Sequence, residues 1–258
     1  MSPSARRAVL LAAAALVLPL ALAACGSAGN GRDDLLVSGA TSLKRAFTEY
    51  GERFSGANVQ LSFAGSDELA AQIRSGAKPD VFAAANTKLP EQLFAEGLVE
   101  KPRVFAANKL VLAVLDNDTR TRAMEDLAEP NTTIAVGAPG VPIGAYTRKV
   151  LGRLPASTRT RILANVRSSE PDVGGITAKI SEGAVKAGLL YATDVAASNG
   201  RLRAIELPPE LQPDVAYGVA VVKGSKRRGA ARDFVDWLLR GDGAGALRAA
   251  GFEPPPGS

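Results

Sequence analysis

Four short segments of the chain join small, hydroxyl-bearing or glycine residues to the start of an expected helix. They are residues 39–42 (GATS), 65–67 (GSD), 140–144 (GVPIG) and 171–175 (PDVGG). The first turn of a helix has backbone N–H groups without partners, and the helix dipole adds partial positive charge there. Such a helix start binds an anion without a full positive charge nearby. The chemistry that these segments can do together is therefore the capture of an anion by hydrogen-bond donors.

Each of these segments also has a simpler interpretation as a helix cap. Serine, threonine and aspartate are capping residues at helix starts in proteins of every kind. In the stretch FAGSDEL, Ser66 is followed by Asp67 and Glu68, and carboxylates also suit a cation. The residues of any one junction are compatible with a helix cap, with a cation site or with an anion site. The occurrence of four such junctions in one chain is what favours a shared anion site.

The composition narrows the possible chemistry further. The 258 residues include no histidine and a single cysteine, Cys25. Ser–His and Cys–His nucleophile pairs and histidine zinc sites are therefore excluded. The net charge of +5 is scattered along the chain and aromatic residues make up only 5%, so we expect no nucleic-acid partner.

An enzyme remains an alternative, because Asp67 or Asp194 could act as a general base without histidine. No nucleophile elbow, phosphate-binding loop or cluster of metal ligands in the sequence supports this alternative. Carboxylates such as Asp80 and Asp194 more often brace a turn or cap a helix, and we assign them that role. We expect no catalytic residue and no cofactor.

The first residues of the chain predict export. Arg6 and Arg7 precede a long apolar run, which is the pattern of a signal peptide over residues 1–24. Small residues lead up to Cys25 as in a bacterial lipobox, so we expect Cys25 to become a lipidated N-terminus. Residues 25–33 then form a flexible tether. These features predict an extracytoplasmic lipoprotein anchored to the cell membrane; a plain signal peptide with an incidental cysteine is the alternative.

Apolar periodicity predicts alternating strands and helices along the rest of the chain. Strands are expected at residues 34–40, 58–65, 80–86, 109–115, 132–140, 187–194, 201–208 and 216–224. Helices are expected at residues 42–54, 67–76, 87–97, 144–154, 157–166, 173–183, 226–241 and 242–252. This alternation is typical of an α/β protein with mostly parallel sheets.

The order of elements predicts two lobes rather than one domain. We expect lobe 1 to comprise residues 34–112 and 221–253, lobe 2 to comprise residues 113–220, and residues 254–258 to form a loose tail. The long apolar runs KLVLAVL and AYGVAVV are the expected crossings between the lobes. Lobe 2 is then an insertion into lobe 1.

Several segments, in order along the chain, resemble one known family. They are residues 38–86, 108–114, 134–151, 171–197, 217–225 and 233–240, with the pieces ATSL, FAGS, PDVF, VPIGAY and GLLYATDV. They are similar to the ModA family, the periplasmic molybdate-binding proteins of ABC importers. The resemblance covers nearly all of the chain after Cys25. It implies a type II periplasmic binding protein fold, in which two α/β lobes close on the ligand.

Carried over position by position, the resemblance implies five ligand-binding residues. Ser42 and Ser66 would donate from lobe 1 through their hydroxyl and backbone N–H groups. Ile143 and Val173 would donate backbone N–H groups from lobe 2, and Tyr191 its phenol O–H. Any metal enters this site only as the centre of the oxyanion that these five residues hold. The sequence pattern alone favours Tyr191 as a core aromatic at the end of a strand.

The implied ligand is molybdate, and tungstate is expected to bind as well because its size and charge are nearly the same. A site made of donors suits a dianion without a proton. Sulfate, another oxyanion or a small organic anion is the alternative. The implied partners are an ABC permease with its ATPase, and the implied state is a monomer. Asp67 departs from the family pattern, which has a small hydroxyl residue there, so its carboxylate should point away from the anion.

Overall fold

The computed structural model describes residues 33–257. The expected signal peptide, the lipidated Cys25 and the tether up to residue 32 lie outside the described residues. Within the described part of the chain, no helix is both long enough and apolar enough to cross a membrane.

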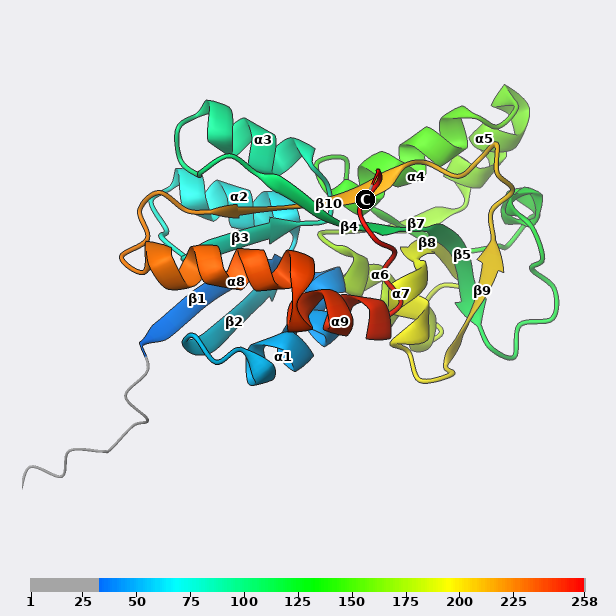
Figure 1. Cartoon of the computed structure of the whole chain (residues 1–258). Helices are drawn as coiled ribbons and strands as arrows, with labels where there is room; N and C mark the ends of the chain where they lie inside the picture. The colour runs from blue at the N-terminus through cyan, green and yellow to red at the C-terminus, as the bar shows by residue number, and fades with distance from the viewer. Residues whose placement is uncertain (1–32, 258) are drawn as a thin grey trace, which may run out of the picture. The chain divides into compact units, whose positions relative to one another are not determined.

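Lobe 1 is built on a sheet of five strands in the order β2-β1-β3-β10-β4. These strands are β1 (Asp34–Ala40), β2 (Asn58–Ala64), β3 (Val81–Ala84), β4 (Arg103–Asn108) and β10 (Val215–Val221). Helices cover both faces of this sheet (Figure 1). They are α1 (Lys44–Arg53), α2 (Ser66–Arg74), α3 (Lys88–Ala95), α8 (Arg228–Arg240) and α9 (Asp242–Ala249).

The central strand β3 shows how the two faces are filled. All four of its residues are fully buried. Phe82 and Ala84 belong to the apolar cluster formed with α2 and α3, whereas Val81 and Ala83 belong to the cluster on the opposite face. Successive side chains of a strand point to opposite faces, so a continuous apolar strand is stable only between two layers of helices.

Lobe 2 is built on a second sheet, with strand order β7-β6-β8-β5-β9. Its strands are β5 (Leu110–Leu115), β6 (Ile134–Gly137), β7 (Val166–Glu170), β8 (Ala187–Tyr191) and β9 (Leu202–Glu206). Its helices are α4 (Pro142–Gly152), α5 (Ala156–Ala164), α6 (Val173–Ser181) and α7 (Ala192–Ala196), and α4 and α6 pack against β6 and β8. The short 3-10 helices are η1 (Thr41–Leu43) in lobe 1 and η2 (Met124–Ala128) in lobe 2.

The expected α/β fold class is confirmed, and both sheets are mixed. β1 pairs in parallel with β2 and β3, and β6 pairs in parallel with β7 and β8. The antiparallel pairings are all made by β10 and β5. These two strands directly follow the crossings between lobes, and each runs antiparallel to both of its neighbours in the sheet that it enters.

The first crossing is the first residue of the apolar run KLVLAVL, whereas the second lies before the run AYGVAVV in which we expected it. β4 ends at Asn108 and β5 begins at Leu110, so Lys109 is the first crossing, and residues 207–214 between β9 and β10 are the second. β5 pairs along most of its length with β8 and β9, and β10 likewise with β3 and β4. A strand paired in this way belongs to a single sheet. Residues 110–115 and 215–221 therefore do not bridge the lobes, and lobe 1 comprises residues 33–108 and 215–253.

Candidate anion-binding site

A cleft between the two lobes collects the ends of strands and the starts of helices that the sequence singled out. Its lining comes from η1, the β2–α2 junction and Ala85 in lobe 1, and from the starts of α4 and α6 and the end of β8 in lobe 2. The space enclosed in the cleft is about 20 Å³. Pockets for drug-sized ligands hold roughly 300–1,000 Å³, so this cleft suits a small ion.

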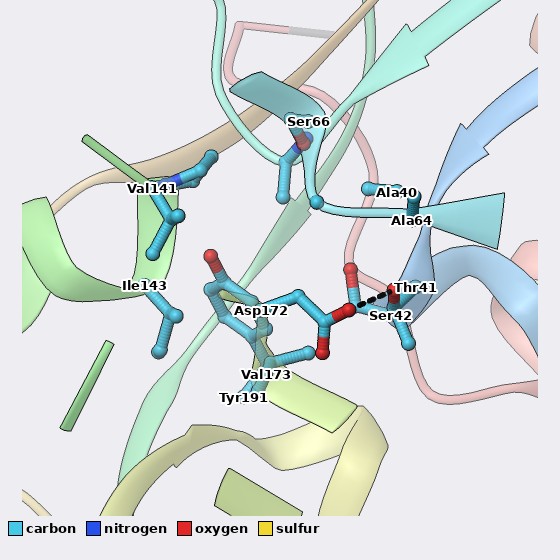
Figure 2. A pocket seen from close by; sticks show the side chains of 13 residues that line it. Ala40, Thr41, Ser42, Ala64, Ser66, Val141, Ile143, Asp172, Val173 and Tyr191 are labelled. Atoms are coloured by element: carbon cyan, nitrogen blue, oxygen red, sulfur yellow. Dashed lines mark hydrogen bonds between the residues drawn. The ribbon is translucent and has the colours of Figure 1, made fainter. Parts of the chain in front are cut away.

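All five residues that the sequence predicted as ligand-binding line this one cleft (Figure 2). They are Ser42, Ser66, Ile143, Val173 and Tyr191. Each of them is buried. The structure thus brings together residues that lie as far apart in the sequence as Ser42 and Tyr191.

The two serines present their hydroxyl groups from lobe 1. Ser66 is the first residue of α2 and is 2% exposed, and its Oγ accepts a hydrogen bond from the backbone N–H of Ala85 at 3.1 Å. Ser42 lies in η1 and is 7% exposed, and its Oγ is 3.1 Å from the phenol oxygen of Tyr217. Both hydroxyls therefore have a partner behind them and an open side toward the cleft.

Capping does not account for most of these helix starts. Gly65 occupies the N-cap position of α2 and Val141 that of α4, and no side chain of the described residues caps either helix. Only α6 has a side-chain cap at this cleft, because Asp172 Oδ1 accepts from the backbone N–H of Gly175 at 3.0 Å. Ser66 is thus not a capping residue, and the first N–H groups of α2 and α4 are free to bind a ligand.

Glycine allows the backbones to approach one another around the cleft. A Cβ atom on Gly144 would lie 2.1 Å from the carbonyl oxygen of Ala138, so only glycine lets α4 begin this close to the end of β6. A Cβ atom on Gly65 would lie 2.7 Å from the carbonyl oxygen of Pro171 in the other lobe. These positions bring the start of α4 close to the end of β6, and the β2–α2 junction close to the segment that precedes α6.

Tyr191 contributes the one phenol of the cleft lining. It ends β8 and is 1% exposed, and its hydroxyl points into the cleft (Figure 2). That hydroxyl has no hydrogen-bond partner among the described residues. Burial, and then the neighbouring Tyr217, Tyr146 and Asp194, raise the pKa of Tyr191 well above its ordinary value. The phenol therefore keeps its proton and can act as a donor to a ligand.

No lysine or arginine belongs to the cleft lining among residues 33–257, and the one carboxylate there is already bound. Besides capping α6, Asp172 accepts from Thr41 Oγ1 at 3.0 Å, so one carboxylate joins the two lobes directly (Figure 2). With Asp172 occupied in this way, the groups left to face a ligand are mostly donors. Such a lining suits an anion.

Asp67 lies beside this cleft but does not line it. Its carboxylate sits between Gly65 and Gly140, where Cβ atoms built on these glycines would be 3.1 Å and 3.7 Å from its two oxygens. Asp67 Oδ1 is buried without a hydrogen-bond partner in the described part of the chain. In residues 33–257 no group of three or more histidine, cysteine or acidic side chains could hold a metal ion. The carboxylates of FAGSDEL therefore belong to no such group.

Asp80 and Asp194, the other two carboxylates that the sequence singled out, have structural positions. Asp80 accepts from the backbone N–H of Leu36 at 2.7 Å and from Ser225 Oγ at 2.6 Å, and so braces the start of β3. Asp194 lies in the first turn of α7, and its Oδ2 is buried without a partner within the described residues. Burial, with a smaller effect from Asp172, raises the pKa of Asp194 to about 7.

The fold and the cleft together define a class of protein: a two-lobed solute-binding protein whose cleft is lined by hydrogen-bond donors. A family model described as bacterial extracellular solute-binding protein matches residues 35–253. The chain belongs to this family, whose members are binding proteins located outside the cytoplasm.

Relatives and solved structures agree with this assignment. The chain is similar to the molybdate-binding protein ModA of Mycobacterium tuberculosis, with 34% identity over 93% of this chain and 95% of the relative. It superimposes on the periplasmic molybdate-binding protein of Azotobacter vinelandii with a TM-score of 0.77 at 21% identity, covering 86% of this chain and 99% of that one. The sulfate-binding protein SubI of Mycobacterium tuberculosis gives a TM-score of 0.77 at 16% identity, covering 87% and 88%. These two structures show the common fold.

Sequence reasoning missed the residues that support the cleft from behind and across the lobes. Tyr217, Thr41 and Asp172 were not singled out as interacting side chains. Tyr217 lies 175 positions from Ser42, and Asp172 lies 131 positions from Thr41. The signal available in the sequence was only that Thr41 and Asp172 belong to two of the four junctions.

Proposed function

We propose that this protein is an extracytoplasmic solute-binding protein that captures molybdate in the cleft between its lobes. The observation that carries the proposal is the chemistry of the cleft lining. Ser42, Ser66 and Tyr191 offer buried hydroxyls, and the helix starts at Ile143 and Val173 offer backbone N–H groups. The relationship to curated ModA proteins supports molybdate as the cargo.

The donor set matches the charge state of molybdate. Molybdate is a dianion without a proton at neutral pH, so it can accept hydrogen bonds on every oxygen and needs no acceptor from the protein. Hydrogen phosphate carries a proton at that pH and requires an acceptor. A site made of donors other than lysine or arginine also buries no counter-ion, and the desolvation of a counter-ion can cost more than the ion pair contributes.

Sulfate is the second candidate, because it is also unprotonated and because SubI shares the fold. The 34% identity to a molybdate-binding relative, against 16% to SubI, favours molybdate. We further propose that tungstate binds nearly as well as molybdate, since the two dianions differ little in size. Size is then the property by which the cleft separates both from sulfate.

Delivery and anchoring complete the proposal. We infer that the loaded protein passes its ligand to an ABC permease driven by an ATPase, as the resemblance to the ModA family implies. Lipidation of Cys25 would hold the protein at the outer face of the cell membrane, and the chain would act there as a monomer without catalytic turnover. Loss of membrane association in a Cys25→Ala variant tests the anchor; unchanged association would refute it.

Isothermal titration calorimetry of the purified mature protein tests the proposed cargo. Molybdate, tungstate, sulfate and phosphate are titrated separately at neutral pH. We expect heat with molybdate and tungstate, weaker binding of sulfate and none of phosphate. Binding of sulfate alone would select the second candidate, and the absence of heat with all four anions would refute an oxyanion site.

A further inference from the structure

The turn between β10 and α8 gathers basic side chains at the end of lobe 1 opposite the cleft. β10 ends at Val221, which pairs with Val81 at the start of β3, and β3 runs parallel to β1. The end of β10 therefore lies beside the starts of β1 and β3 (Figure 1), whereas the cleft lies where β1 and β2 end. This basic turn, residues 223–228, carries four cations: Lys223, Lys226, Arg227 and Arg228. None of the four lines the cleft.

A buried carboxylate fixes the basic turn to the sheet. Asp80 accepts from Ser225 Oγ at 2.6 Å and from the backbone N–H of Leu36 at 2.7 Å. Ser225 Oγ in turn accepts from the backbone N–H of Arg227 at 2.9 Å. Asp80 and Ser225 are both buried, and they join β1, the start of β3 and the basic turn. The cations are thus carried on a backbone that hydrogen bonds hold in place.

Three lysines at this end of lobe 1 are free to meet a partner. A Cβ atom on Gly224 would lie 3.1 Å from the stem of Lys78, so Lys78 packs on the basic turn. Lys78, Lys223 and Lys226 are exposed, and within residues 33–257 none of them forms an ion pair.

Acidic side chains at the same end are already engaged. Glu100 pairs with Arg232 at 2.7 Å, and Asp34 accepts from Asn58 Nδ2 at 2.5 Å. Asp33 Oδ2 lies 4.0 Å from Arg227 Nε. The three lysines therefore give this face positive charge that no paired acid neutralises.

The chain enters lobe 1 at this same end. Asp33, the first described residue, lies beside Arg227 in the basic turn. Residues 26–32 separate it from Cys25, and an extended chain of that length reaches at most about 30 Å. A lipid on Cys25 would therefore keep the basic turn near the membrane. Anionic headgroups attract lysine and arginine side chains near their surface, and a basic patch is a second membrane signal beside a lipid.

We propose that the basic turn, together with Lys78, is a docking surface for the anionic phospholipid headgroups of the membrane that carries the protein. The proposal rests on the proposed lipid anchor at Cys25. Its consequence is an orientation of the anchored protein. Lobe 1 rests on the membrane with the end that carries the basic turn, and the cleft at the opposite end stays accessible to the ligand.

Binding to vesicles tests the docking surface without the lipid anchor. The purified mature protein, with no lipid attached, is sedimented with vesicles of phosphatidylcholine alone or of phosphatidylcholine and phosphatidylglycerol in equal parts. We expect binding only to the vesicles with phosphatidylglycerol, and less of it as salt is added. A triple variant, Lys78→Gln with Lys223→Gln and Lys226→Gln, should lower this binding by about tenfold or more.

The matched control removes the same charge elsewhere. It combines Lys88→Gln at the start of α3, at the cleft end of lobe 1, with Lys179→Gln and Lys186→Gln in lobe 2. We expect the control to bind as the wild type does, and unchanged melting temperatures to show that both variants are folded. Equal binding of the wild type to both kinds of vesicle, unchanged binding of the first variant, or an equal loss in the control would each overturn the proposal.

Attachment through Cys25, the only cysteine, tests the orientation. The mature protein is coupled by this thiol to a maleimide lipid in either kind of vesicle. Trp237, the only tryptophan, is 54% exposed on α8, the helix that begins in the basic turn. Energy transfer from Trp237 to a dansyl-labelled lipid should be higher with phosphatidylglycerol, and the first variant should lose the difference; equal transfer in the wild type would refute the orientation. These outcomes are independent of molybdate titration and of the Cys25→Ala variant, which test the proposed function separately.

Discussion

Replacing Tyr191 with phenylalanine separates ligand binding from folding more sharply than any other change at the cleft. The hydroxyl of Tyr191 is buried, points into the cleft and has no partner among the described residues. The ring packs edge-on against Tyr146 and Tyr217, and phenylalanine preserves these contacts. The variant therefore removes one donor to the anion and little else.

The expected effects on binding and on stability have different signs. A hydrogen bond to a charged group contributes roughly 1.5–3 kcal/mol, so we expect the affinity for molybdate to fall by about 10- to 150-fold. A buried hydroxyl without a partner stabilises nothing in the unliganded protein and costs its desolvation. The free energy of unfolding of the unliganded variant should therefore be unchanged or slightly raised.

Tyr50→Phe provides the opposite pattern and serves as the control. Its hydroxyl donates to the Phe234 carbonyl at 2.8 Å in the core of lobe 1. Its loss leaves that carbonyl without this donor, so the free energy of unfolding should fall by about 1 kcal/mol with no change in affinity. Calorimetric titration and urea denaturation of both variants measure the two quantities. Wild-type affinity in a folded Tyr191→Phe, or a clear loss of its unliganded stability, would refute the role assigned to this phenol.

Three further predictions follow from other contacts. Ser66→Ala should lower both molybdate affinity and stability without unfolding the chain, because it removes a donor to the anion and the acceptor of the Ala85 N–H; a folded variant with wild-type affinity in titration would contradict this. Thr41→Val removes the hydrogen bond to Asp172 that joins the lobes. The dissociation rate of molybdate in stopped-flow experiments should therefore rise by about two- to tenfold. An unchanged rate would show that the contact does not hold the lobes closed. Asp194 has a pKa of about 7 in the folded protein and about 4 in an unfolded chain, so the folded state binds more protons in this window and stability falls as pH rises from about 4 to about 7. The chain has no histidine to mask the effect, and Asp194→Asn should flatten the slope of melting temperature against pH; an equal slope in both proteins would contradict the assignment.

Local pattern was sufficient to predict the elements that carry the cleft. β1 occupies residues 34–40 as the apolar run indicated, and Gly76 ends the turn after α2 with a positive φ of 100°, as expected of a helix-ending glycine. The edge strands β4 and β7 were missed. β7 reads VRSSE and has no fully buried residue, so it lacks the apolar signal by which a strand is recognised.

The crossings between lobes could not be read from hydrophobicity. KLVLAVL is apolar because β5 is buried within one sheet, and the same is true of AYGVAVV and β10. The actual crossings are Lys109, at the start of the first run, and residues 207–214, before the second run. Burial measures how deeply a strand lies in a sheet and does not show which sheet it joins.

Some residues of the candidate site are likewise indicated by local features of the sequence, and others only by contacts between distant segments. Helix starts are local features, so the sequence could indicate the donors at Ser42, Ser66, Ile143 and Val173. The direction in which those donors point depends on partners from distant segments. Tyr217 behind Ser42 and Asp172 opposite Thr41 become visible only when the fold brings β10 and α6 to the cleft.

A crystal structure of the protein with molybdate tests the central claim most directly, because the anomalous signal of molybdenum locates the ion. The account predicts one peak in the cleft between the lobes. Its oxygens should lie within about 2.7–3.2 Å of the hydroxyls of Ser42, Ser66 and Tyr191 and of the backbone nitrogens at Ile143 and Val173. A peak bound instead by surface lysine or arginine side chains, with the cleft unoccupied at saturating molybdate, would contradict it.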